Sequence, residues 1–158
     1  MSRNRVLLAL AITGCTVILV TAVGGRPSLT AAPAPAHRIV GSWVNVLKVS
    51  GLPALPSLVT FTSDGIFLWS GPFGSTSGGH GVWTSTGDRT LTGTFMYLRR
   101  NAGGDFTGTV KSRFKATLNA TYDQAAGSGK ADFFDAQGKM VRSVDYTVDG
   151  TRIKVESP

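Results

Sequence analysis

Residues 106–118 read FTGTVKSRFKATL. Even-numbered positions, such as Val110, Phe114 and Leu118, are apolar or small, whereas odd-numbered positions are threonine, lysine or arginine. Because successive side chains of a strand point to opposite faces, this alternation predicts a strand with one face buried and the other in water. A run of thirteen residues is long for a strand. Such length is typical of closed or strongly coiled sheets.

The sequence on both sides of this stretch repeats the pattern in shorter runs that end in turn residues. Glycine, aspartate and asparagine in those turns tolerate the positive φ of tight antiparallel connections. No window after residue 38 has helical periodicity. The expected strands are 39–49, 57–63, 65–70, 80–85, 89–99, 106–118, 120–134 and 139–148, with a short tail at 151–156. The expected turns include 63–65, 87–88, 101–104, 136–138 and 149–150.

This pattern predicts one all-β domain over residues 37–158. Without a crossover helix a parallel sheet is excluded, and a meander of eight one-sided strands hides its edges by closing into an antiparallel up-and-down barrel. A β-sandwich is the alternative. The side chains expected inside are aromatic or apolar, namely Trp43, Phe61, Phe67, Trp83, Phe95, Tyr97, Phe106, Val110, Phe114, Phe133 and Tyr146.

The first 36 residues have the features of an export segment. Arg3 and Arg5 precede an uncharged apolar run over 6–23, and 34–36 has the small-x-small form of a signal-peptidase site. We expect residues 1–36 to be a bacterial-type signal peptide with a Pro/Ala-rich linker. The protein would then be secreted or periplasmic.

Two other readings of this segment stay open. Cys15 ends a lipobox-like run, which would make it a lipid anchor, and residues 6–23 just reach the length of an uncleaved membrane span. Cys15 is also the only cysteine, so the predicted barrel has no disulfide and must be stable through its core.

Charge narrows the range of partners. The chain has 16 basic and nine acidic residues, and removal of residues 1–36 lowers the net charge from +7 to +4. This value is too small to indicate a nucleic-acid binder. A group of basic side chains on one hairpin could make weak contact with an anionic membrane or wall surface: Arg99, Arg100, Lys111, Arg113 and Lys115. Their alternative role is solubility of a wet strand face.

Both ends of the predicted barrel carry short motifs. Gly41-Ser42-Trp43 opens the first strand, and Gly150-Thr151-Arg152 lies near the C-terminus. Together they resemble the calycin pattern of lipocalins and their relatives, which implies that Arg152 packs over Trp43 and closes the barrel base. Residues 41–45 also resemble the first strand of avidin-type biotin binders, which implies a ligand contact for Asn45. Allene-oxide-cyclase-like proteins use a barrel of similar layout.

Candidate ligand contacts also come from the residues themselves. His80 is the only histidine in the predicted barrel and lies among glycines, so it is either a turn residue or a rim contact. Arg142 falls on the apolar side of its strand; we expect a bulge to turn it outward, and if it points inward it would suit a ligand carboxylate. Trp83 and Tyr97 complete the candidates. No catalytic residue, metal site or cofactor is predicted, because His80 has no cysteine or second histidine to act with in the barrel.

The preferred function is non-catalytic binding of a small, mostly apolar molecule outside the cytoplasm. A cavity-type isomerase or cyclase is the first alternative, with His80, Asn45 or Arg142 taking part. A barrel filled by its own side chains, acting as an envelope interaction module, is the second. The sequence leaves the ligand and the oligomeric state open.

Overall fold

The computed structural model describes residues 38–157, which form a closed antiparallel barrel in which each strand pairs with the next and the last pairs with the first. The predicted barrel is therefore confirmed and the sandwich is excluded. The predicted signal peptide with Cys15 and the predicted linker lie outside the described residues. No helix within 38–157 is long and apolar enough to cross a membrane. The strands are β1 (Gly41–Lys48), β2 (Leu55–Phe61), β3 (Ile66–Ser70), β4 (Gly79–Ser85), β5 (Thr90–Arg100), β6 (Phe106–Leu118), β7 (Gln124–Phe134) and β8 (Met140–Arg152).

The last strand is longer than predicted. Asp149 and Gly150 were expected to form a turn, but β8 runs through them to Arg152. Gly150 is paired with Asn45 of β1, and a Cβ at this glycine would lie 2.6 Å from the Asn45 Oδ1 atom. The glycine is therefore needed for a close side-chain approach and not for a change of direction. Its place in β8 lets the final strand reach β1 and close the barrel.

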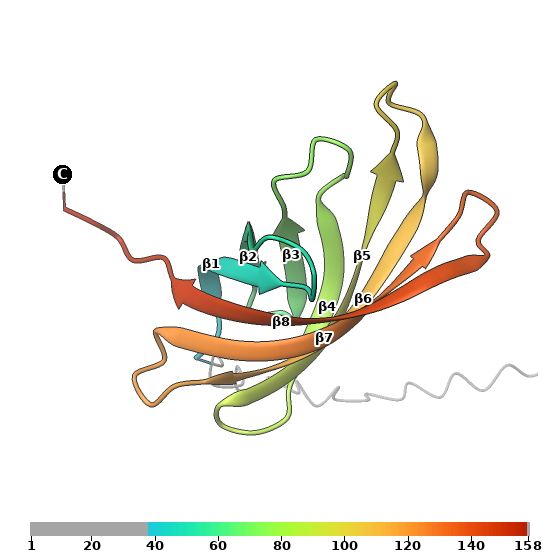
Figure 1. The fold of residues 1–158 in the computed structure, drawn as a ribbon. Coiled ribbons are helices and arrows are strands. Elements are labelled where there is room, and N and C mark those ends of the chain that lie inside the picture. Colours follow the sequence, from blue (N-terminus) through green and yellow to red (C-terminus); the bar gives the residue numbers. More distant parts are fainter. Residues whose placement is uncertain (1–37, 158) are drawn as a thin grey trace, which may run out of the picture. The chain divides into compact units, whose positions relative to one another are not determined.

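The turns define two ends of the barrel. The β2–β3, β4–β5 and β6–β7 turns lie at one end, together with Arg38 and Arg152, and we call it the closed end. The β1–β2, β3–β4, β5–β6 and β7–β8 connections lie at the other, which we call the open end. Figure 1 shows the β3–β4, β5–β6 and β7–β8 turns projecting to the upper right, and the β4–β5 and β6–β7 turns at the lower left.

Most of the side chains expected inside are inside, with one clear exception. Phe106 is half exposed, because the pairing of β5 with β6 shifts between Arg99 and Arg100 and leaves Thr107 without a partner. Gly108, beside this bulge, has a φ of 136°, a conformation that L side chains rarely adopt. The alternation of inward and outward side chains therefore holds from Gly108 to Leu118 and does not include Phe106. Trp69 is not among the side chains expected inside, yet it is buried in the core.

Opposite sides of the interior have different side chains. Rings from β2, β3, β5 and β6 pack edge-on, tilted or stacked, with the Phe67 centroid 4.9 Å from that of Phe114 and 5.0 Å from that of Phe95. The inward positions of β7 are mostly glycine or alanine, including Gly127 and Ala131. Because close packing needs volume from both sides, the small residues leave space beside the rings.

Candidate functional site

A cavity of about 550 Å³ occupies the barrel interior. Loop residues of the open end, including Leu52, Phe73 and Thr76, line it together with inward side chains of the strands. The lining reaches Trp43 at the closed end, where Trp43 and Leu91 are almost fully buried in the apolar core. The volume is within the range of small-molecule sites, and an eight-stranded barrel has room for one such ligand.

A few polar groups interrupt the apolar lining. The hydroxyls of Ser112 and Tyr146 are hydrogen-bonded to each other at 2.6 Å, and either can donate. The amide of Asn45 and the hydroxyl of Ser57 also line the cavity. Such a site has an apolar body with a small number of polar groups, which is the usual composition of a ligand pocket.

Two phenols in the lining are shielded from water. Burial raises the pKa of Tyr97 above its ordinary value near 10, and Arg99 and Arg142 act in the opposite sense. Burial also raises the pKa of Tyr146, while the hydrogen bond with Ser112 lowers it. Both phenols are therefore neutral at physiological pH and available as hydrogen-bonding groups.

Two arginines lie where the cavity meets the open end. The guanidinium carbon of Arg142 is 4.3 Å from the centroid of the Phe133 ring, and that of Arg99 is 5.6 Å from the same centroid. Both side chains line the cavity. The expectation that a bulge turns Arg142 outward is wrong. A bulge is present, but its extra residue is Val141, so Arg142 keeps the inward phase of Val144.

The structure divides the other predicted contacts into two groups. Asn45 and Tyr97 line the cavity. Trp83 does not: it packs edge-on against Phe61 at the closed end and donates its indole N–H to the Thr62 carbonyl. His80 is exposed on the outer face of β4, since the neighbouring glycines Gly79 and Gly81 take the inward positions. Neither Trp83 nor His80 is therefore placed to touch a molecule in the cavity.

Arg152 and Trp43 meet at the closed end. The guanidinium carbon of Arg152 lies 4.4 Å from the centroid of the Trp43 ring. Arg152 also donates to the carbonyls of Tyr122, at 2.9 Å, Val40, at 2.8 Å, and Arg38. The Trp43 indole in turn donates to the Ile39 carbonyl at 2.9 Å. This geometry is the one that the calycin resemblance implies for the two residues.

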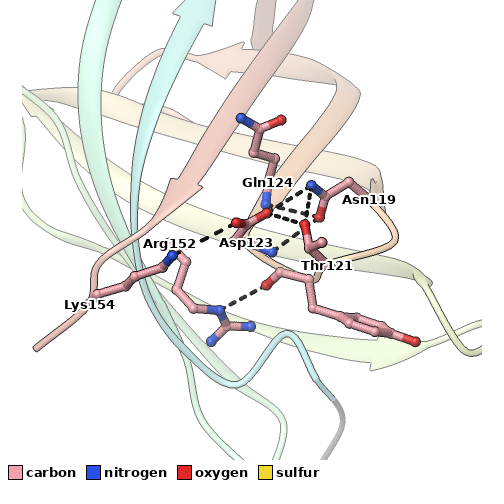
Figure 2. A network of polar contacts seen from close by, with 7 residues as sticks. Asn119, Thr121, Asp123, Gln124, Arg152 and Lys154 are labelled. Atoms are coloured by element: carbon pink, nitrogen blue, oxygen red, sulfur yellow. Dashed lines mark hydrogen bonds and ion pairs between the residues drawn. The ribbon is translucent and has the colours of Figure 1, made fainter.

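The β6–β7 turn supports that arrangement. Figure 2 shows the Asn119 side chain bonded to Asp123, Gln124 and Thr121, with Arg152 donating to the turn and Lys154 near Asp123. The Asn119 Oδ1 atom accepts the backbone N–H groups of Asp123 and Gln124. Asparagine thus fixes the turn from which the Tyr122 carbonyl reaches Arg152.

The expected basic group on the β5–β6 hairpin is divided between the two faces of the barrel. Arg99 lines the cavity, whereas Arg113 is outward and forms an ion pair with Asp132, which also accepts from the Ser143 hydroxyl at 2.6 Å. Arg100 and Lys115 are exposed. The pattern of alternation could have revealed Arg99, since it shares the inward phase of Phe95 and Tyr97.

Comparisons with known proteins identify no family for this chain. No protein-family model matches the chain, and no curated protein matches it. A solved structure described as EF1p2_mFAP2b bound to DFHBI is similar at 14% identity, with a TM-score of 0.48, over 75% of this chain and 96% of that one. Within residues 38–157 no group of three histidine, cysteine or acidic side chains could hold a metal ion.

Proposed function

We propose that this barrel binds one small, mostly apolar molecule in its interior without transforming it. The observation that carries the proposal is the cavity of about 550 Å³ that opens between the loops of the open end. A barrel filled by its own side chains, the interaction-module hypothesis, does not fit this volume.

The composition of the cavity supports an apolar ligand. Its rings, among them Trp69 stacked on Tyr97 with centroids 4.8 Å apart, form a rigid apolar surface. Removing such a surface from water stabilises a complex by roughly 25 cal/mol per Å² of apolar area. The hydroxyls and amides of Asn45, Ser57 and Ser112 are few, which suits the orientation of a ligand more than the binding of a highly polar one.

Two further parts of the proposal come from the sequence. We propose that the protein is exported, because residues 1–36 have the features of a signal peptide. We also propose that the barrel is of the calycin type, because of the two end motifs and the contact of Arg152 with Trp43. Detection of the mature N-terminus of the protein made in a bacterial host tests the first of these. An uncut chain found in the cytoplasm would contradict it.

Filling the cavity tests the binding proposal. Ala131 of β7 points into the cavity, whereas Ala126 of the same strand is exposed. We expect Ala131→Trp to lower the affinity for the neutral dye Nile red at least tenfold, because the indole takes the ligand's volume, and Ala126→Trp to leave it unchanged. Fluorescence titration measures both, with circular dichroism and thermal unfolding as controls for folding.

A second blocking variant guards against a folding defect at one site. Val144→Trp enters the cavity from β8 and should act as Ala131→Trp does. Wild-type protein that takes up no Nile red and no other neutral apolar probe would overturn the proposed function. Equal loss of dye binding in Ala126→Trp would show that the dye lies on the outer surface, and this result would also overturn the proposed function.

A further inference from the structure

The mouth of the cavity holds an unusual juxtaposition of like charges. Arg99 comes from β5 and Arg142 from β8, yet both guanidinium groups lie against the single ring of Phe133 on β7. We call this pair the mouth arginines. Contact with a ring orients a guanidinium group but leaves its N–H donors free for another partner.

No counter-ion from residues 38–157 neutralises the mouth arginines. The ion pairs found there involve other cations, namely Lys48, Arg113, Lys130 and Lys154. No hydrogen bond of the described residues engages either guanidinium group. Both groups are therefore held at the cavity edge with their donors unused by this part of the chain.

The acidic side chains of the neighbouring turns are already engaged. Asp105 accepts from the Asn101 amide at 3.0 Å, and Asp135 accepts the backbone N–H groups of Gln137 and Lys139 at 3.0 and 2.9 Å. These bonds stabilise the β5–β6 and β7–β8 turns themselves. Among the described residues, neither carboxylate forms an ion pair with a mouth arginine.

We propose that the mouth arginines bind the anionic head of an amphipathic ligand, a carboxylate, whose apolar body fills the cavity. Two cations held over one ring repel each other, and an anion that contacts both adds attractive interactions that offset this repulsion. Guanidinium groups bind carboxylates with paired, charge-assisted hydrogen bonds. The neutral Tyr97 phenol, from the same face of β5 as Arg99, is a further donor for the head.

This inference depends on the proposed function, because it names the class of molecule that enters the same cavity. The position of the mouth arginines also sets the orientation of the ligand in the cavity. The apolar chain enters first toward the rings of Phe67 and Phe114, and the head stays at the open end. A neutral molecule of equal length would gain the apolar contacts alone.

Matched probes and matched variants test the inference. The probes are dodecanoate and 1-dodecanol, which share the apolar chain and differ in the charge of the head, each measured by displacement of Nile red. The variants are Arg99→Gln, Arg142→Gln and, as the control, Arg100→Gln. Arg100 is adjacent in sequence and exposed, and its substitution changes the net charge by the same amount.

We expect wild-type protein to bind dodecanoate at least tenfold more tightly than dodecanol. Arg99→Gln and Arg142→Gln should each lower the dodecanoate affinity roughly tenfold or more, consistent with the loss of charge-assisted hydrogen bonds, and leave dodecanol unchanged. Arg142→Lys should restore part of the loss, because it keeps the charge without the paired geometry. Arg100→Gln should have no effect beyond general electrostatics.

Equal affinity of wild type for the two probes would overturn the carboxylate inference while the proposed function stands. An equal effect of Arg100→Gln would overturn it too, since net charge and not the mouth would then be responsible. Failure of both probes and of Nile red would overturn the proposed function together with the inference. Unchanged dodecanol binding in the variants shows that their cavities are intact.

Discussion

Tyr97 and Tyr146 are phenols in a lining made mostly of hydrocarbon. Their hydroxyls are polar groups that can form hydrogen bonds. Burial raises the pKa of each hydroxyl, so both stay protonated at neutral pH. The Tyr146 ring lies over Gly129, where a Cβ would approach it to 2.4 Å. The absence of a side chain at one residue therefore fixes the position of a ring on the next strand.

The phenols predict a dependence of stability on alkaline pH. Because the pKa of each phenol is higher in the folded than in the unfolded chain, the unfolded chain releases protons first. The contribution of the two buried phenols to the free energy of unfolding is complete below a pH of about 10. It is lost as the pH rises through the pKa values of the folded chain. We expect the double variant Tyr97→Phe, Tyr146→Phe to lose less free energy of unfolding between pH 8 and 11 than wild type, measured by urea unfolding. Identical pH profiles would contradict this assignment.

Single-residue reading of the sequence succeeded where the period of two holds and failed where a bulge interrupts it. The alternation placed Tyr97 and Phe114 inside, and the same rule, applied without a bulge, would have placed Arg142 inside. It failed for Phe106, because Thr107 shifts the phase. The position of His80 was also not predicted. Its side chain points outward because the flanking glycines Gly79 and Gly81 take the inward positions of β4. A contact between Arg99 and Phe133 joins distant strands, and no local pattern encodes it.

Strand pairs in this barrel approach closely at glycines that face large rings. Gly81 of β4 is paired with Phe95 of β5, and Gly93 of β5 is paired with Phe114 of β6. A Cβ at Gly93 would lie 2.5 Å from the Phe114 ring. Cross-strand pairs of this kind let a ring cover the neighbouring backbone, which strengthens the sheet and allows its curvature.

The β4–β5 pair gives a prediction about glycine. We expect Gly81→Ala to lower the free energy of unfolding by about 2 kcal/mol, because its Cβ would lie 2.1 Å from the Thr94 carbonyl oxygen and force the strands apart. Gly74→Ala, in the β3–β4 connection with nothing within 4 Å, should change it by less than about 0.5 kcal/mol. Urea unfolding compares the two. Similar losses would show that backbone flexibility and not the contact matters.

The barrel as a whole is closed where its first and last strands pair. Trp43 is directly opposite Arg152 in that pair, and the Arg152 guanidinium group also donates to the backbone of the segment before β1 and of the β6–β7 turn. One side chain thus joins three parts of the chain. Because the described domain has no cysteine, this junction and the apolar core carry its stability.

Removing that junction should weaken the entire barrel. We expect Arg152→Met to lower the free energy of unfolding by about 3 kcal/mol, since three carbonyl groups lose a charged donor and Trp43 loses its cation. Arg89→Met, also at the closed end but at an exposed side chain, is the control. Thermal and urea unfolding measure both variants. A loss equal to that of the control would mean that strand pairing alone closes the barrel.

At this scale the sequence was most informative. Eight one-sided strands, turn residues between them and no helical period sufficed to predict a closed antiparallel barrel, because few other arrangements bury one face of every strand. The cavity could not be predicted. Its volume depends on the sizes of side chains on opposite sides of the interior, with large rings on β3 and β5 and glycines and alanines on β7. Alternation does not specify these sizes.

Arg38 and Arg152 bring the two ends of the described chain together at the closed end, while the mouth lies among the loops at the opposite end. Immobilisation on a sensor chip through a C-terminal tag therefore leaves the entrance directed into the flow. A fluorescent protein fused at the same terminus would report on abundance without obstructing uptake. A fluorescent label that is meant to report ligand binding should instead be attached to the β5–β6 or β7–β8 turn.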